Sequence, residues 1–296
     1  MGLGDVYKRQ VFDADNLLSE DYISRMNETF SDGYRIITSY RNSKNYGDNW
    51  ISAGYALWFL REAKYLNNAR YLLGTSCAVS GTGFMFSREI LKSCGGWPFH
   101  LLVEDIEFTI HNIVSGEKVG YCPRAVLYDE QPTKFSQSWK QRMRWARGYI
   151  QILRKYGGRL LHGIFAKRSF SCFDMTMNIA PAVILSFLGI IINVGAAVYS
   201  VLNGGGTDVL LQSFGQLILN TCLMMFIIGA ITTISEWKNI YCSTPKKILY
   251  AFTFPLFMLT YLPICIVALF RPVKWEPIVH DRVRTLREVR GEGNAA

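Results

Sequence analysis

The sequence predicts an α/β domain followed by an α-helical membrane region. Short apolar runs with strand character alternate with helical patterns over residues 11–135, which is typical of α/β domains. Residues 134–168 then carry ten Lys or Arg and no acidic residue. Three runs without a charged residue follow, at 175–202, 209–235 and 248–270. Each is long enough to cross a bilayer core of about 30 Å as a helix, which buried core helices of a soluble protein rarely match three times in succession.

The elements of the α/β domain can be placed from their periodicity and turn residues. We expect a short strand to end at the sequence VFDADN, and strands and helices to alternate after it. The predicted order is a helix over 21–30, a strand over 34–42, a helix over 49–66, a strand, turn and short helix over 77–97, a helix over 103–114 and a strand-rich segment over 118–130. This alternation predicts a mostly parallel sheet. Residues 1–10 show no clear period, and we expect them to be a non-native leader.

The distribution of positive charge predicts the membrane orientation. The basic stretch of residues 134–168 lies immediately before the first uncharged run, so the positive-inside rule places the α/β domain in the cytoplasm. We therefore expect a multi-pass protein of the cell inner (plasma) membrane, with basic interfacial helices over 136–173 and a membrane region over 174–271. The tail, residues 272–296, can lie on either side. Pro255 and Pro263 can also break the third run into an interfacial or re-entrant element.

Composition narrows the classes of partner. The formal net charge is +9, but its basic cluster abuts the membrane run instead of spreading over a domain face with aromatic residues, so we expect no nucleic acid partner. The seven cysteines include no C-x-x-C pair, which fits reduced thiols better than disulfides or zinc ligands. A transporter would place ionisable residues inside the spans, and the three uncharged runs contain none.

Two aspartates, Asp13 and Asp15, follow the first predicted strand. Carboxylates spaced to point the same way repel each other unless a cation lies between them, so the pair indicates a metal site. Aspartate is also an ordinary turn residue, and the pair alone does not decide between the two interpretations.

Two further clusters lie downstream. Ser80, Gly81 and Thr82 form a small-residue turn, where glycine allows a substrate to approach the backbone, although an ordinary turn has the same composition. Glu104 and Asp105 open a predicted helix, where acids favour the positive end of the helix dipole. A carboxylate at the mouth of a sheet can instead act as a general base.

The sequence QRMRW places Gln141, Arg144 and Trp145 on one face of a helix. Arginine offers a planar fork for phosphate, glutamine an amide and tryptophan a flat apolar surface. The alternative is a basic helix lying on the membrane, and we expect this interpretation to hold for the neighbouring Arg142, Arg147 and Arg154.

These motifs, in this order and followed by membrane helices, resemble the processive family-2 glycosyltransferases, such as cellulose, hyaluronan and poly-N-acetylglucosamine synthases. The motifs are Asp-Ala-Asp, Ser-Gly-Thr, Gly-Gly-Trp, Glu-Asp and Gln-x-x-Arg-Trp, and the resemblance extends from about Val11 to Phe270. It implies that residues 11–135 are the C-terminal part of a GT-A-like catalytic domain. It also implies that an upstream half-domain is missing and that the chain alone is inactive.

The resemblance implies a role for each motif. Asp13 and Asp15 correspond to the family's DxD pair, with Asp15 as a direct ligand of Mg²⁺ or Mn²⁺ at the diphosphate of a UDP-sugar. Asp105 corresponds to the catalytic base and Glu104 to its partner. Gln141, Arg144 and Trp145 correspond to the motif that binds the diphosphate and the acceptor. Ser80, Gly81 and Thr82 correspond to the acceptor-side turn, where some relatives carry Cys in place of Ser80.

The implied reaction is an inverting transfer of a sugar to a growing β-linked polysaccharide at the cytoplasmic membrane face, coupled to export of the polysaccharide. Two alternatives remain at this point. A non-processive enzyme would add one sugar to a lipid acceptor and form a glycolipid. A protein of another class would bind or transport a ligand at the membrane without catalysis.

Overall fold

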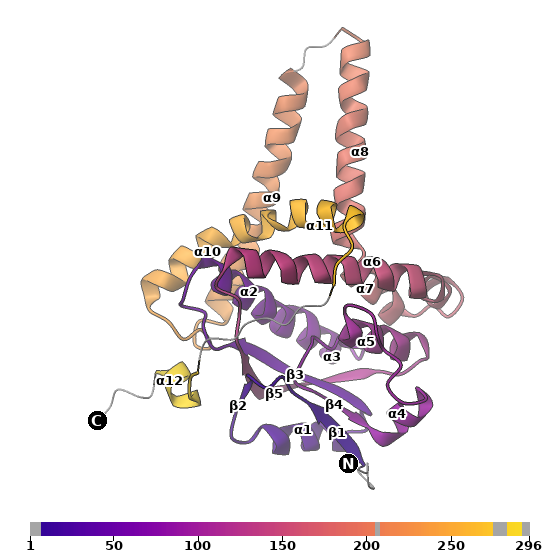
Figure 1. Cartoon of the computed structure of the whole chain (residues 1–296), viewed down its shortest axis with the longest axis vertical. Helices are drawn as coiled ribbons and strands as arrows, with labels where there is room; N and C mark the ends of the chain where they lie inside the picture. The colour runs from indigo at the N-terminus through magenta and orange to yellow at the C-terminus, as the bar shows by residue number, and fades with distance from the viewer. Residues whose placement is uncertain (1–6, 205–207, 275–282, 292–296) are drawn as a thin grey trace.

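A five-stranded sheet forms the centre of the α/β domain in the computed structural model, which describes residues 7–204, 208–274 and 283–291 (Figure 1). The strand order is β1-β4-β3-β5-β2. The strands are β1 (Lys8–Val11), β2 (Leu17–Leu18), β3 (Ile36–Ser43), β4 (Phe84–Ser87) and β5 (Val119–Asp129). Three residues of the expected non-native leader, 8–10, therefore belong to β1, and residues 1–6 lie outside the described part of the chain.

The sheet is mixed, so the expectation of a mostly parallel sheet was wrong. Only β3 and β5 pair in parallel, whereas β4 is antiparallel to both β1 and β3, and β2 is antiparallel to β5. The cause is the turn at Ser80–Gly83. We expected a strand before this turn, but the strand, β4, begins after it and runs between β1 and β3 in the opposite direction. As a result β1, β3 and β5 point the same way, and their carboxyl ends meet at one edge.

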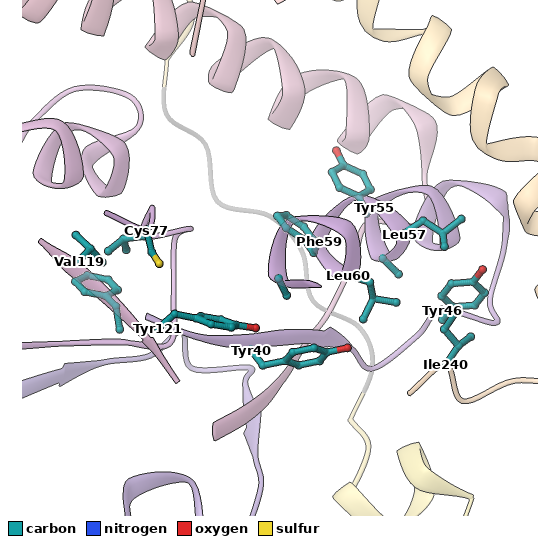
Figure 2. Packing of buried hydrophobic residues seen from close by; sticks show 14 of the residues in the cluster. Tyr40, Tyr46, Tyr55, Leu57, Phe59, Leu60, Cys77, Val119, Tyr121 and Ile240 are labelled. Atoms are coloured by element: carbon teal, nitrogen blue, oxygen red, sulfur yellow. The ribbon is translucent and has the colours of Figure 1, made fainter. Parts of the chain in front are cut away.

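Helices cover both faces of the sheet (Figure 1). On one face, α1 (Tyr22–Ser31) buries Tyr22 and Met26 against β-strand residues such as Ile37 and Leu127. The other face carries α2 (Trp50–Arg61), the π-helical turn η1 (Glu62–Asn67), α3 (Asn68–Leu72), α4 (Arg88–Ser93) and α5 (Glu104–Val114). Figure 2 shows the larger core on this face, where Phe59 and Leu60 of α2 lie above Tyr40 of β3 and Tyr121 of β5.

The helix α2 begins at Asn49, whose side chain accepts hydrogen bonds from the N–H groups of Ile51 and Ser52 in a capping box. The sequence predicted one apolar face for this helix, but it is buried almost all round. Its second face packs against α10, where a Cβ added to Gly54 would lie 2.3 Å from the Phe257 ring. This close approach ties the C-terminal apolar segment to the α/β domain.

Basic and apolar helices follow the α/β domain. They are α6 (Phe135–Phe165), α7 (Phe170–Ile179), α8 (Pro181–Leu202), α9 (Asp208–Ser235), α10 (Thr244–Leu259) and α11 (Tyr261–Phe270). In Figure 1, α8 and α9 project side by side away from the domain, whereas α6 and α11 lie across its top. Within the described residues, Leu211–Ser235 and Thr244–Phe270 are long and apolar enough to span a membrane, and Ile191–Leu202 is a shorter apolar helix.

The third apolar run is broken at Thr260, between α10 and α11. Pro255 lies inside α10 and Pro263 in the first turn of α11, which agrees with the break that these prolines indicated in the sequence. The last helix, α12 (Leu286–Arg290), starts at a Thr285 capping box and buries Val289. Arg284, just before it, contacts the loop that follows β3, so this part of the tail packs on the α/β domain.

Candidate active site

Three aspartates meet at the edge of the sheet where β1, β3 and β5 end. Asp13 and Asp15 follow β1, and Asp129 is the last residue of β5. One carboxylate oxygen from each of the three lies within 4.8 Å of the others. Sequence reasoning identified Asp13 and Asp15 but missed Asp129, although the signal is similar, an acid at the end of a strand.

The Ser80–Thr82 turn is joined to the aspartate pair. The Asp13 N–H donates to Thr82 Oγ1 at 3.0 Å, and the Thr82 hydroxyl donates to Asn16 Oδ1. Asn16 Nδ2 in turn donates to Asp129 Oδ1 at 3.1 Å. The turn predicted to lie on the acceptor side therefore also fixes the backbone of the predicted metal-binding motif.

Gly81 has φ +76°, in the left-handed region that side chains other than glycine rarely adopt. A Cβ there would lie 3.9 Å from Asp105 Oδ2 and 3.8 Å from Arg41 Nη1. The turn thus lies directly between the predicted catalytic base and the acidic cluster, and glycine keeps the space between these groups open.

Asp105 and Glu104 occupy the first turn of α5, as predicted. Burial raises the pKa of Asp105 to about 6, and the neighbouring Glu104 charge contributes to the rise. Backbone N–H groups of Ile106 and Gly81 and the charge of Arg144 act in the opposite direction on this pKa. A carboxylate with a pKa near 6 exchanges a proton readily near neutral pH, as a general base requires.

Arg41 on β3 is a site residue that sequence reasoning missed. Its Nε donates to Asp129 Oδ2 at 3.1 Å, and its Nη1 donates to the Ser80 carbonyl at 2.8 Å. The guanidinium carbon also lies 3.7 Å from the centroid of the Phe59 ring. An arginine near the carboxyl end of the strand IITSYRNS was the available signal. The fork of Arg41 connects the acidic cluster to the Ser80–Thr82 turn.

Lys44, in the loop after β3, is a second residue that the sequence did not reveal. Only 5% of Lys44 is exposed, and its Nζ donates to the Asp15 carbonyl. The same nitrogen lies 3.8 Å from Asp15 Oδ2 and 3.5 Å from Glu130 Oε2. A buried cation beside these carboxylates offsets part of their mutual repulsion.

The Gln-x-x-Arg-Trp motif lies on α6, as predicted, with its three residues on the side that faces the domain. Arg144 Nη1 donates to the Leu102 carbonyl at 2.9 Å, in the segment just before Glu104. The Trp145 ring packs edge-on against Tyr55 at a centroid distance of 5.7 Å. Gln141 Oε1 is buried and has no hydrogen-bond partner in the described part of the chain. A buried acceptor without a partner indicates a place for a ligand donor.

The membrane-surface interpretation of Arg142 was wrong, and Arg147 also makes protein contacts. Arg142 is 2% exposed, and its Nη1 donates to Phe257 O at 3.0 Å and Thr260 Oγ1 at 2.8 Å, near the end of α10. Arg147 Nη1 donates to two carbonyls near the end of α11, those of Ala268 and Leu269. Cations favour helix C-termini because the last carbonyls lack partners. Arg154 is exposed, as the interfacial interpretation requires.

The sheet edge and its motifs are shared with a known family. Residues 10–148 match the family model described as "Glycosyltransferase like family 2". These residues form a family-2 glycosyltransferase domain of GT-A-like fold. The resemblance drawn from the motifs is confirmed at this level. The match covers the DAD pair, the Ser80–Thr82 turn, Glu104–Asp105 and the Gln-x-x-Arg-Trp motif.

Curated relatives align with parts of the chain. A probable glycosyltransferase, YdaM, of Bacillus subtilis is 33% identical over 97 residues, which is 33% of this chain and 22% of the relative. A poly-beta-1,6-N-acetyl-D-glucosamine synthase of Staphylococcus epidermidis is 30% identical over 88 residues, 30% of this chain and 21% of the relative. A beta-monoglucosyldiacylglycerol synthase of Synechocystis is 28% identical over 142 residues, 48% of this chain and 29% of the relative. The aligned part of the chain thus spans between 21% and 29% of the length of these relatives.

Among solved structures, a mannosyltransferase from Pyrobaculum calidifontis, in complex with GDP-Man and Mn²⁺, aligns with 89% of this chain and 62% of its own. The TM-score is 0.48 and the sequence identity is 14%.

The donor set of the acidic cluster fits a hard divalent cation. Asp13, Asp15 and Asp129 offer carboxylate oxygens within one coordination sphere's reach, and no histidine or cysteine joins them in the described residues. Oxygen-only ligands suit Mg²⁺ and Mn²⁺ better than zinc or copper. The residues present are therefore compatible with the expected metal.

Proposed function

We propose that this protein transfers a sugar from a UDP-sugar to an acceptor hydroxyl, with Asp105 as the catalytic base and the DAD pair at the donor diphosphate. One observation carries the proposal. The Ser80–Thr82 turn contacts the backbone of Asp13 at one end and lies beside the Asp105 carboxylate at the other. A base and an anion-binding metal site on the two sides of one small-residue turn match the needs of a glycosyl transfer.

Each group in the site has a role in the transfer. Asp13 and Asp15, with Asp129 beside them, would hold Mg²⁺ or Mn²⁺, which supplies positive charge for the leaving diphosphate. Asp105 takes the proton from the acceptor hydroxyl as its oxygen forms the new bond to the anomeric carbon. The bond from that carbon to the diphosphate oxygen breaks, and its electron pair leaves with the nucleoside diphosphate. One such displacement inverts the anomeric configuration, so an α-linked donor gives a β-linked product.

The Gln-x-x-Arg-Trp motif is assigned to diphosphate and acceptor binding. Arg144 lies close enough to Asp105 for its charge to affect the Asp105 pKa, and the buried Gln141 Oε1 awaits a donor such as a sugar hydroxyl. Trp145 offers an aromatic surface in the same helix. We therefore place the acceptor end between the helix α6 and the Ser80–Thr82 turn.

The acceptor class has two candidates, and a growing polysaccharide is the first. The motif order and the similarity to a poly-beta-1,6-N-acetyl-D-glucosamine synthase support this choice. The second candidate is a lipid that receives one sugar to form a glycolipid, supported by the similarity to a beta-monoglucosyldiacylglycerol synthase. A binding or transport protein without catalysis does not account for the family-2 glycosyltransferase domain.

We also propose that the protein lies in the inner membrane with its catalytic domain in the cytoplasm, and that α8 and α9 form the membrane-crossing hairpin. Large apolar side chains on these two helices are exposed to the surroundings, among them Ile191, Ile192, Leu211, Phe214 and Leu219. The third apolar run is different, because α10 packs on α2 and both α10 and α11 end on arginines of α6. We therefore assign α10 and α11 to the membrane surface.

Cysteine labelling tests this topology. In a chain whose partly exposed Cys94, Cys222 and Cys242 are replaced by serine, Asn203→Cys lies between α8 and α9 and Arg287→Cys lies on α12. A membrane-impermeant maleimide should label position 203 in intact cells and position 287 only after permeabilisation. Labelling of both positions in intact cells would support three crossings and contradict the hairpin.

A transfer assay tests the reaction itself. Membranes containing the protein are supplied with labelled UDP-sugars and Mn²⁺ or Mg²⁺. Wild type is compared with Asp105→Asn and with Glu20→Gln, which removes an exposed acid that belongs to none of the site motifs. We expect one sugar to enter large, glycosidase-sensitive material in wild type and the control, and a loss of at least about 100-fold in Asp105→Asn. Label in a small lipid instead would identify the second acceptor class. Equal activity of Asp105→Asn would refute the assignment of the base.

A further inference from the structure

The tail segment Val283–Gly291 lies against a loop after β3 and the end of β5, which both carry site residues and are distant from it in sequence. It contains α12, a short helix with its own capping box at Thr285 and a left-handed glycine cap at Gly291. Val289 is buried at 5% exposure, which anchors the segment on the domain. The segment is therefore a defined element of the fold with a fixed contact surface.

Arg284 is the main polar contact of the tail segment. Its Nη1 donates to the Lys44 carbonyl at 2.9 Å, and its Nη2 donates to Asp48 Oδ1 at 3.0 Å. One guanidinium thus bridges the two ends of the five-residue stretch from Lys44 to Asp48, between β3 and α2. Because the fork is planar and rigid, two such bonds fix the shape of this loop and not only its position.

The loop that Arg284 holds is the one that delivers Lys44 to the acidic cluster. The Lys44 carbonyl accepts from Arg284, while the Lys44 amine donates to the Asp15 carbonyl and lies between the carboxylates of Asp15 and Glu130. Two hydrogen bonds, both made by Lys44, therefore connect the tail segment to the DAD pair. At the other end of the segment, Arg290 Nε lies 3.4 Å from the hydroxyl of Tyr128, the residue before Asp129.

We propose that the tail segment positions the metal-binding carboxylates and that Arg284 is its positioning residue. Arg284 fixes the backbone of Lys44, and Lys44 in turn fixes the backbone of Asp15 and offsets the charge of the carboxylates around it. This inference rests on the proposed metal-binding role of the DAD pair. It predicts that a change at residue 284, remote from the catalytic residues in sequence, weakens divalent metal binding.

The test measures Mn²⁺ binding to the purified full chain in detergent, by electron paramagnetic resonance of free Mn²⁺. Arg284→Ala removes the fork, and Asp48→Asn weakens the same contact from the loop side. Arg287→Ala is the matched control, because Arg287 is an exposed arginine on the same tail segment. We expect Mn²⁺ to bind about tenfold more weakly to Arg284→Ala, the lower end of the effect of residues that support metal ligands. Asp48→Asn should shift affinity in the same direction, and Arg287→Ala should match wild type.

Hydrogen exchange provides a readout that does not depend on the metal. Amides of residues 44–48 should exchange faster in Arg284→Ala than in Arg287→Ala, while those of α5 remain unchanged. The variant Asp15→Asn separates the two levels of inference. If Asp15→Asn binds Mn²⁺ like wild type, the proposed metal role of the DAD pair fails. If Asp15→Asn loses Mn²⁺ but Arg284→Ala binds it like Arg287→Ala, the metal site stands and the positioning role of the tail is overturned.

Discussion

Arg142 Nη1 donates a 3.0 Å hydrogen bond to the carbonyl of Phe257, which joins the Gln-x-x-Arg-Trp helix to the end of the apolar helix α10. The guanidinium carbon also lies 4.5 Å from the centroid of the Phe257 ring. Arg142 is next to Gln141 in sequence and points toward α10. The helix that carries the Gln-x-x-Arg-Trp motif therefore also holds the C-terminal apolar segment in place.

Replacement of Arg142 should destabilise the protein. Arg142→Ala removes hydrogen bonds from a charged donor and leaves a cavity, so we expect a loss on the order of 3 kcal/mol in the free energy of unfolding. Arg142→Met keeps most of the volume and removes the buried Nε and Nη2, which have no partners among the described residues, so its loss should be smaller. Thermal unfolding in detergent measures the loss of stability in both variants.

The control is Arg154→Ala, which replaces an exposed arginine of the same helix and should lie within about 0.5 kcal/mol of wild type. A similar loss in the control would contradict the special role of Arg142.

Gly148 on α6 should be required for the placement of Glu104 and Asp105. A Cβ at Gly148 would lie 2.6 Å from Val103 Cγ2, and Val103 is the N-cap of α5. Gly148→Ala should therefore displace the start of α5 and lower both stability and transfer activity, with overpacking costing about 1–3 kcal/mol.

The same helix offers a control for this prediction. Gly157, also in α6, has no atom within 4 Å of an added Cβ. Gly157→Ala should stabilise the helix by up to about 1 kcal/mol through propensity alone and leave activity unchanged. Equal behaviour of the two variants in unfolding and transfer assays would show that the contact between α6 and Val103 is unimportant.

The charged Asp105 carboxylate, which the reaction needs, should lower the stability of the folded protein, and this effect should depend on pH. Its pKa is about 6 in the folded protein, above the 3.8 of an unfolded chain, so the folded state binds the proton more tightly. The resulting stabilisation is fully present below pH 3.8 and is lost as the pH rises through about 6. At pH 8, Asp105→Asn should therefore be more stable than wild type and unfold at a higher temperature. The gain in the free energy of unfolding should be up to about 3 kcal/mol, at roughly 1.4 kcal/mol per pKa unit.

The pH profile of the two proteins distinguishes this mechanism from a general change in packing. The difference in unfolding temperature between Asp105→Asn and wild type should shrink between pH 8 and pH 5. Wild-type transfer activity should fall below about pH 6 as the base becomes protonated. A pH-independent difference in stability would argue that the asparagine acts through packing and not through the carboxylate charge.

Replacement of Arg41 should lower transfer activity by more than a loss of protein stability would explain. Its fork holds both Asp129 and the Ser80 carbonyl, and lysine cannot reproduce two such contacts. We expect Arg41→Lys to lower transfer by about 10- to 100-fold, as seen for residues that orient metal ligands. The comparison is Arg35→Lys, which lies just before β3 and pairs with Glu117 at the surface. Arg41→Lys activity equal to that of Arg35→Lys would remove Arg41 from the site.

The order of the helices and strands, and the position in the chain of most candidate site residues, could be predicted without the structure. Acids directly after an apolar run located Asp13 and Asp15 at a strand end, and the acids that open α5 located Glu104 and Asp105. Gln141, Arg144 and Trp145 could be assigned to one helix because a spacing of three and four residues is a local property of the backbone. These predictions depend on residues that are close together in the sequence, so a single sequence was sufficient to make them.

The tertiary structure alone decided which distant groups meet. Asp129, Arg41 and Lys44 join the site through strand ends that are far apart in the chain, and no local pattern encodes their pairing. The direction of β4 depends on one turn, so the alternation of strands and helices in the sequence led to the wrong expectation of a mostly parallel sheet. Hydropathy could not show which apolar helices pack on the domain, because an apolar side chain suits a protein core and a lipid bilayer equally well. Only the tertiary structure shows that α10 packs on α2 through Phe257 and that α10 and α11 are held by Arg142 and Arg147 of α6.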